Sequence, residues 1–233
     1  MPGRYPPKDG CVFCRIVAGD EAARYVAPGG LETAKRADLK PEGVLAFRNR
    51  LTWVPVMLIV VPVGHPTQEE LWTNPELFVP AVRHALALGE EHCAGGGEGG
   101  KPGEGFRLVS NFGRVAHQSQ EHGHIHVISR PESEPMPAVE DGAAPLSSRN
   151  GVAVHAADAV SAPWSVRLTL EGASSQREMW REERFPELVA AAVDLSERES
   201  PEGFRFAADF QPAPGLGPPG LFVLGGGPLD LYA

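Results

Sequence analysis

The strongest hydrophobic pattern in the chain is a near-continuous apolar run over residues 55–65, PVMLIVVPVGH. So few polar interruptions are typical of a strand that is buried on both faces. Shorter apolar segments predict strands at 43–49, GVLAFRN, and at 106–112, FRLVSNF. A fourth strand is predicted within 118–130, QSQEHGHIHVISR, where a polar start leads into an apolar run.

Helical spacing follows the long apolar run. Thr67 and Glu70 have the spacing of a capping box, which predicts the start of a helix. A longer helix is predicted over 75–93, with Pro75 in its first turn. Its buried face is predicted to carry Leu77, Val82, Ala85 and Leu86.

Three histidines alternate along the fourth predicted strand: His122, His124 and His126. Because a strand repeats every two residues, the three imidazoles are predicted to share one face and Gly123, Ile125 and Val127 the other. Three imidazoles on one face suit metal or phosphate chemistry. The alternative is an exposed His-rich strand that binds metal adventitiously, and the mid-chain position argues against it.

The spacing H-x-H-x-H-V-I, with Asn111 upstream and Gln118 and Ser119 just ahead of the first histidine, resembles the histidine triad (HIT) superfamily of nucleotide hydrolases and transferases. The opening CVFCRIVAGD also resembles that of HIT proteins. The resemblance covers residues 1–130. It implies an α+β fold in which an antiparallel sheet carries helices.

The resemblance assigns His124 as the nucleophile on the α-phosphate of a nucleotide, after which water releases the nucleoside monophosphate. A neutral imidazole can attack phosphorus and divide one displacement between two easier steps. His126 would donate to a phosphate oxygen, and Ser119 would lie near the leaving group. The alternative for His124 is a structural histidine with its hydrogen bonds satisfied.

The remaining nucleotide contacts are also carried over from the resemblance. Asn111, Gln118 and Ser119 would supply neutral donors around the phosphate. Asn49 stands where HIT hydrolases often place an aspartate on the ribose. Two further positions depart from the family. His117 replaces a glycine of the phosphate loop, and Glu121 adds a carboxylate that repels an anionic substrate unless it is turned away or paired.

Cys11 and Cys14 form a C-x-x-C pair, which in a reducing compartment indicates metal ligands or a redox motif. In zinc-binding HIT proteins and galactose-1-phosphate uridylyltransferases, two histidines at the positions of His65 and His122 complete the metal site that begins with the C-x-x-C pair. The resemblance therefore implies a structural Zn²⁺ site, since four protein ligands leave no open position. The alternative is a free thiol pair. Cys93 is predicted to be a plain thiol.

Residues 95–101 match the phosphate-loop pattern G-x-x-x-x-G-K. Pro102 occupies the Ser/Thr position and a strand follows instead of a helix, so this interpretation fails.

The second half of the chain repeats the first. The segment from Gly43 to Trp72 aligns without gaps on the segment from Gly151 to Trp180, and later blocks align after small length changes. Such a match predicts a duplication. Gly220 and Phe222 stand where His124 and His126 stand, so the second copy has lost its chemistry.

We therefore predict a catalytic domain at 1–130, a linker rich in Pro, Glu, Ser and Ala at 131–150, and a degenerate HIT-like repeat at 151–233. Ordinary HIT proteins form homodimers whose sheets join. A chain with two copies can make this pairing internally, as in the uridylyltransferases, which predicts a monomeric pseudo-dimer with one live site. The alternatives are a separate second module or a chain that still dimerises.

The net charge of -9 offers no basic surface for a long nucleic acid, although one phosphate can still be held locally. No apolar run is long enough to span a bilayer and no leader pattern opens the sequence, so we expect a soluble, cytoplasmic protein without a membrane partner.

The leading functional hypothesis is a HIT hydrolase that cleaves nucleoside phosphoramidates or (di)nucleoside polyphosphates through a nucleotidyl-His124 intermediate. A nucleotidyltransferase is the second hypothesis. Transferases of this superfamily commonly carry glutamine at the third triad position, so His126 favours hydrolysis. A non-catalytic nucleotide-binding protein is the third, because of the departures at Asn49, His117 and Glu121.

Overall fold

The structure is a computed structural model of the 233-residue chain. It describes residues 5–39, 43–51, 54–94, 105–129, 143–159, 162–210 and 219–229. The phosphate-loop match at 95–101 and residues 131–142 of the predicted linker lie outside the described residues.

The chain divides into two compact units. The first unit comprises Met1–Arg107 with Gln120–Arg130, and the second comprises Leu108–Ser119 with Pro131–Ala233. The segment 108–119 therefore belongs to the same unit as residues 131–233, although residues 120–130 between them belong to the first unit. The predicted division at 130 and 151 stays a prediction.

The first unit contains an antiparallel sheet, as the α+β prediction required. In the order in which they pair, its strands are β2 (Leu31–Thr33), β1 (Tyr25–Ala27), β3 (Val44–Arg48), β4 (Met57–Pro62) and β6 (Ile125–Ser129). All six residues of β4 are buried, which confirms the reading of the long apolar run.

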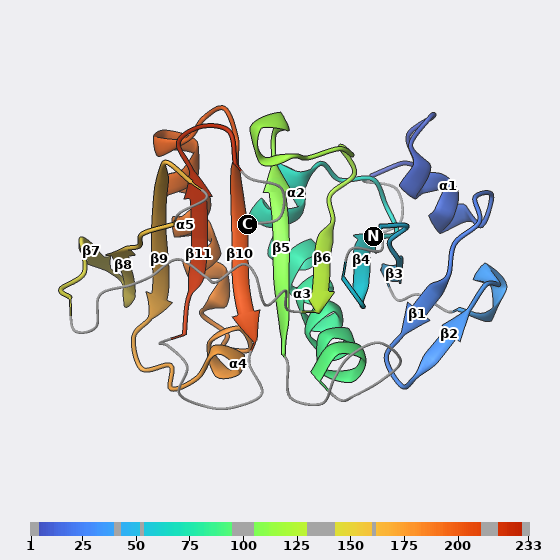
Figure 1. The fold of residues 1–233 in the computed structure, drawn as a ribbon, viewed down its shortest axis with the longest axis horizontal. Helices are drawn as coiled ribbons and strands as arrows, with labels where there is room; N and C mark the ends of the chain where they lie inside the picture. Colours follow the sequence, from blue (N-terminus) through green and yellow to red (C-terminus); the bar gives the residue numbers. More distant parts are fainter. Residues whose placement is uncertain are drawn as a thin grey trace. The chain divides into compact units, whose positions relative to one another are not determined.

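The described residues of the first unit form three α-helices and two short helical turns. They are α1 (Val12–Ala18), α2 (Gln68–Thr73) and α3 (Pro75–Gly89), with the 3-10 turn η1 (Arg36–Asp38) and the π-helical turn η2 (Glu90–Ala94). The capping box of Thr67 and Glu70 is confirmed at the start of α2. Figure 1 shows α3 lying along β4 and β6, which it contacts.

The predicted buried face of α3 is correct for Val82, Ala85 and Leu86 but wrong for Leu77, which is half-buried. Phe78 takes the buried position instead and stacks on Trp72, with ring centroids 5.8 Å apart. The larger aromatic contact sets the rotation of the first helical turn, because it buries more apolar surface than Leu77 would.

The two faces of the sheet in the first unit are covered by different helices. Leu45 and Phe47 of β3 pack in the cluster that holds Phe13 of α1. Val44 and Ala46 alternate with them and so point to the other face, which α3 covers. The side chains of this unit are therefore divided between an α1 face and an α3 face.

The second unit has a similar composition of elements. They are η3 (Arg114–Ala116), β7 (Ser147–Arg149), β8 (Val152–Ala156), β9 (Trp164–Leu170), α4 (Gln176–Met179), α5 (Phe185–Glu199), β10 (Phe204–Phe210) and β11 (Leu221–Gly225). The strand β5 (Phe106–Phe112) contributes its residues from Leu108 onward, and the strand order is β5-β10-β11-β9-β8-β7. Among the described residues, no helix is long and apolar enough to cross a membrane.

Candidate metal and phosphate site

Four predicted metal ligands lie together in the first unit. The ligand atoms of Cys11, Cys14, His65 and His122 all lie within 4.8 Å of one another. Cys11 is the N-cap of α1, and its Sγ accepts a hydrogen bond of 3.4 Å from the Cys14 backbone N–H. The first turn of the helix therefore presents both sulfur atoms to the same point.

The sulfur-to-nitrogen distances in this cluster match a tetrahedral zinc site. Sγ of Cys14 lies 3.2 Å from Nδ1 of His65 and 3.6 Å from Nδ1 of His122, and Sγ of Cys11 lies 3.7 Å from the latter. Tetrahedral Zn²⁺ with ordinary Zn–S and Zn–N bonds separates S and N by about 3.6 Å. The donor set and its spacing fit the ion.

The orientation of His122 also suits a metal ligand. Its Nε2 donates to the Pro62 carbonyl oxygen at 3.0 Å, which leaves the lone pair on Nδ1, the atom that faces the sulfurs. The residue is fully buried, and burial lowers the pKa of His122 to about 4, so the imidazole is neutral. Metal ligation requires this neutral form.

Glu121, next to the cluster, is paired with Lys8 through its carboxylate. The Lys8 backbone N–H also lies 3.4 Å from Sγ of Cys14, so the same residue contacts the cluster and the carboxylate. Lys8 holds the pKa of the Glu121 carboxyl below its ordinary value through a hydrogen bond and its charge. The positive charge of Lys8 therefore offsets the negative charge of Glu121, which immediately precedes His122.

The predicted strand through all three histidines is wrong in its first half. The strand β6 begins only at Ile125, and His122 forms a single isolated bridge with Thr67. The Gly123 backbone N–H donates to the Pro66 carbonyl at 2.8 Å. The backbone ahead of Ile125 is thus bonded to the loop before α2 and does not continue the ladder.

The backbone of His124 is held by a side chain that the sequence analysis missed. The amide of Gln68 accepts from the His124 N–H at 2.8 Å and donates to the His124 carbonyl at 3.1 Å. Gln68 is 2% exposed, so both bonds are shielded from water. The signal was its alignment with Gln176, one of the few polar matches between the two halves.

The ring of His124 has a defined tautomer. Its Nδ1 lies 2.8 Å from the His122 carbonyl oxygen and must donate to it, so Nε2 carries the lone pair. Burial lowers the pKa of His124, which keeps the imidazole neutral. A buried neutral ring with one nitrogen fixed by a carbonyl is suited to attack through the other nitrogen.

His126 and Phe13 lie beside the His124 ring. The His126 ring lies edge-on to it, with centroids 4.9 Å apart, and His126 faces Ile59 across the ladder. Phe13 lies 5.3 Å from His124 and 5.5 Å from Phe47, centroid to centroid. Because Ile59 belongs to the cluster under α1, the triad side of the sheet is the α1 face.

Asn49 lies just beyond β3 in the first unit and is half-buried. Its Oδ1 accepts a hydrogen bond of 3.1 Å from the Leu51 N–H, and its own N–H donates to the Met57 carbonyl at 2.8 Å. The side-chain oxygen thus stabilises the local turn.

Three predicted phosphate contacts belong to the second unit. Asn111 is buried, and its Oδ1 accepts a hydrogen bond of 2.8 Å from Nε of Arg205. Oε1 of Gln118 accepts from the Gly113 N–H at 2.7 Å, and Ser119 is exposed. The structure therefore brings the four metal ligands together with His124 and His126 in the first unit, and groups Asn111, Gln118 and Ser119 in the second.

His117 also belongs to the second unit and adopts the left-handed backbone, with φ 63°. This is the conformation that glycine adopts most readily, and the family pattern expects glycine there. The ring of His117 bonds the Leu229 carbonyl through Nε2 at 2.7 Å. The side-chain contact helps to hold the strained backbone.

No model of a known protein family matches the chain. Over 126 residues it is 27% identical to an uncharacterized HIT-like protein of Methanocaldococcus jannaschii, covering 53% of this chain and 81% of that protein. It is 25% identical over 127 residues to the adenosine 5'-monophosphoramidase hnt1 of Schizosaccharomyces pombe, covering 53% and 77%. The structure is similar to a HIT family hydrolase from Clostridium thermocellum, with 21% identity, a TM-score of 0.42, and coverage of 55% and 96%. Over about half of its length, the chain is therefore similar to proteins described as HIT-like or as an adenosine 5'-monophosphoramidase.

Proposed function

We propose that this chain is a HIT-type hydrolase of nucleoside phosphoramidates or (di)nucleoside polyphosphates. The observation that carries the proposal is the 2.8 Å hydrogen bond between Nδ1 of His124 and the His122 carbonyl oxygen. It fixes the proton on Nδ1 and the lone pair on Nε2, as a nucleophile requires. The similarity to a relative named as an adenosine 5'-monophosphoramidase supports the substrate class.

In the proposed reaction, Nε2 of His124 attacks the α-phosphorus, and the bond from phosphorus to the leaving nitrogen or oxygen breaks. The leaving group takes up a proton and departs, and a nucleotidyl-His124 intermediate remains. Water then attacks the same phosphorus, the P–N bond to His124 breaks, and the nucleoside monophosphate leaves. One water is consumed and the neutral imidazole is restored.

Other residues are proposed to stabilise the charge that grows on the phosphoryl oxygens. His126, edge-on to His124, would donate to a phosphate oxygen. The family resemblance assigns Asn111 and Gln118 as further donors, Ser119 to the leaving group, and Asn49 to the ribose. Phe13, next to the His124 ring, offers an apolar contact to the nucleoside.

The structural metal in this proposal is Zn²⁺, held by Cys11, Cys14, His65 and His122. When bound, the ion would link α1 to the segment that carries His124, without an open position for catalysis. The 3.2–3.7 Å spacing of sulfur and nitrogen atoms supports this assignment.

We further propose that residues 151–233 are a degenerate copy that serves as an internal partner. The same side-chain contact recurs at the aligned positions: Gln176 accepts from the Gly220 N–H at 2.6 Å and donates to the Gly220 carbonyl at 2.8 Å. Gly220 stands where His124 stands, so this copy retains the backbone support without the nucleophile. Sedimentation of a monomer would support the pseudo-dimer, and a dimer would contradict it.

The hydrolase proposal is tested by intact mass after brief mixing with adenosine 5'-phosphoramidate. We expect an adenylyl adduct and released AMP in the wild type, and neither in His124→Ala. His155→Ala, which removes a half-exposed histidine of the second half, is the control and should behave as wild type. AMP production that persists in His124→Ala would overturn the proposed nucleophile.

The two alternative functions correspond to other outcomes of the same experiment. An adduct that is stable in buffer and transfers its nucleotide to an added sugar 1-phosphate would indicate the nucleotidyltransferase. Binding of AMP without adduct or product, tested with both substrate classes, would indicate the non-catalytic nucleotide-binding protein.

A further inference from the structure

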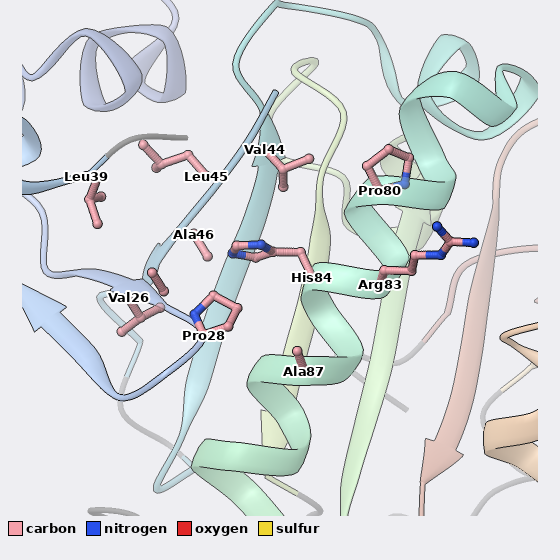
Figure 2. A pocket seen from close by; sticks show the side chains of 11 residues that line it. Val26, Pro28, Leu39, Val44, Leu45, Ala46, Pro80, Arg83, His84 and Ala87 are labelled. Atoms are coloured by element: carbon pink, nitrogen blue, oxygen red, sulfur yellow. The ribbon is translucent and has the colours of Figure 1, made fainter. Parts of the chain in front are cut away.

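A cavity of about 460 Å³ lies in the first unit between α3 and the strands β1 and β3. Its walls are aliphatic side chains and proline rings, among them Val44, Ala46 and Pro80 (Figure 2). Its size lies within the range of small-molecule sites, which is roughly 300–1,000 Å³. None of the residues proposed for zinc or nucleotide binding lines it.

The cavity lies mainly on the face of the sheet opposite the triad, although Leu39 and Leu45 of the α1 cluster also line it. Val44 and Ala46 point to the α3 face, whereas Phe47 packs with the α1 cluster. His126 pairs with Ile59 of that same cluster and therefore lies on the α1 face. A molecule in the cavity is separated from the proposed reaction by the thickness of the sheet.

Two polar residues of α3, Arg83 and His84, line the cavity. Figure 2 shows the imidazole of His84 extending toward Ala46 and Pro28, whereas the guanidinium of Arg83 points the other way. Nε2 of His84 is buried and has no hydrogen-bond partner among the described residues. Burial lowers the pKa of His84, so the ring is neutral.

These features limit the chemistry of a ligand. An anion or cation in an apolar cavity without a charged partner loses its hydration and gains little in return. A neutral molecule with an apolar body does not have this large hydration free energy to lose. A single hydroxyl on such a molecule can bond the neutral imidazole, which has both a donor and an acceptor.

The second unit contains a matching cavity that serves as an internal comparison. It measures about 470 Å³ and lies between α5 and the strands β7 and β8. The segment PELFVPAV at 75–82 aligns on PELVAAAV at 186–193. When this alignment is continued, Arg83 falls on Asp194 and His84 falls on Leu195. Both units therefore have a cavity at this place in the fold. The imidazole of His84 lines the cavity of the first unit, whereas Leu195 stands at the aligned position in the second.

We infer that the cavity beside α3 binds a small, uncharged aromatic molecule that carries one hydroxyl group, with the His84 imidazole as its polar contact. The aromatic ring lies against the aliphatic walls, and the hydroxyl bonds a ring nitrogen of His84. This site is independent of the proposed hydrolase activity, because it lies on the other face of the sheet.

The test is an NMR titration of the full chain with p-cresol and with toluene, which differ by the hydroxyl alone. We expect amide shifts around Ala46, His84 and Ala87, and p-cresol binding roughly tenfold tighter than toluene, the worth of one hydrogen bond. In His84→Leu, which copies the residue of the second cavity, the preference for p-cresol should disappear while toluene still binds.

Leu195→Ala in the second unit is the matched control and should leave both affinities unchanged. A dispersed spectrum and an unchanged melting midpoint show that His84→Leu is folded. The inference is overturned if neither probe shifts these amides at millimolar concentration, or if the tenfold preference persists in His84→Leu.

Discussion

Gln68 holds His124 by its backbone on both sides, with bonds of 2.8 Å to the N–H and 3.1 Å to the carbonyl. This is the support that a strand neighbour would ordinarily provide, supplied here by one side chain from the start of α2. The backbone of His124 is therefore held in place although His124 lies outside the strand β6.

Replacing Gln68 by leucine should lower kcat on the order of 100-fold, because a small displacement of a reacting group has that effect. KM should change little, since Gln68 is not proposed to touch the nucleotide. Gln176→Leu is the matched control, because it loses the same two bonds, to Gly220. Equal losses of activity in both variants would show that Gln68 acts through stability alone.

Native mass spectrometry of the full chain should show one bound Zn²⁺. Cys14→Ser and His122→Ala should lose the ion, and their melting midpoints should fall by roughly 4–8 °C, for a loss of ~2 kcal/mol. Cys93→Ala removes the buried thiol outside the cluster and should keep the metal. Retention of zinc by His122→Ala would exclude this residue as a ligand.

Gly123 lies where a side chain has no room. A Cβ at this position would meet the Thr67 carbonyl oxygen at 2.7 Å and Cβ of Leu71 at 2.8 Å. Gly123→Ala should therefore push the segment with His122 and His124 away from α2, at a cost of about 1–3 kcal/mol by thermal unfolding. One kcal/mol corresponds to a shift of ~2–4 °C for a chain of this size, so a midpoint within about 1 °C of wild type would contradict this steric argument.

Glu32 stabilises the edge of the first unit through two arginines. Arg48 donates to it at 2.8 and 2.9 Å, and Arg24 lies 2.6 Å away. Arg48 first, and then Arg24, hold the pKa of the Glu32 carboxyl below its ordinary value. The stabilisation is therefore complete above the unfolded pKa of about 4.3 and is lost as the pH falls through the folded value.

We expect Glu32→Gln to destabilise the protein by roughly 1 kcal/mol at pH 7 in urea unfolding. The difference from wild type should vanish below the folded pKa of Glu32. Glu197→Gln, on the exposed side of α5, is the control and should show no such pH dependence. A constant difference at all pH values would mean that the charge of Glu32 is not the cause.

The sequence by itself determined the elements whose signals are local. The apolar run of β4 and the capping box of Thr67 and Glu70 each depend on neighbours within a few residues, so a pattern suffices to predict them. The C-x-x-C spacing is local in the same sense, since one helical turn brings Cys11 and Cys14 together. The four candidate metal ligands could be named from spacing combined with a family resemblance.

Only the tertiary structure decided which groups hold the site in place. The pairing of Lys8 with Glu121 joins residues 113 positions apart, and the bonds from Gln68 to His124 span 56 positions. It also decided that β6 begins at Ile125, because the backbone ahead of it bonds to Pro66 and Gln68 instead of a strand. Periodicity reports which side a residue favours, whereas the partner of a polar group depends on segments brought together by folding.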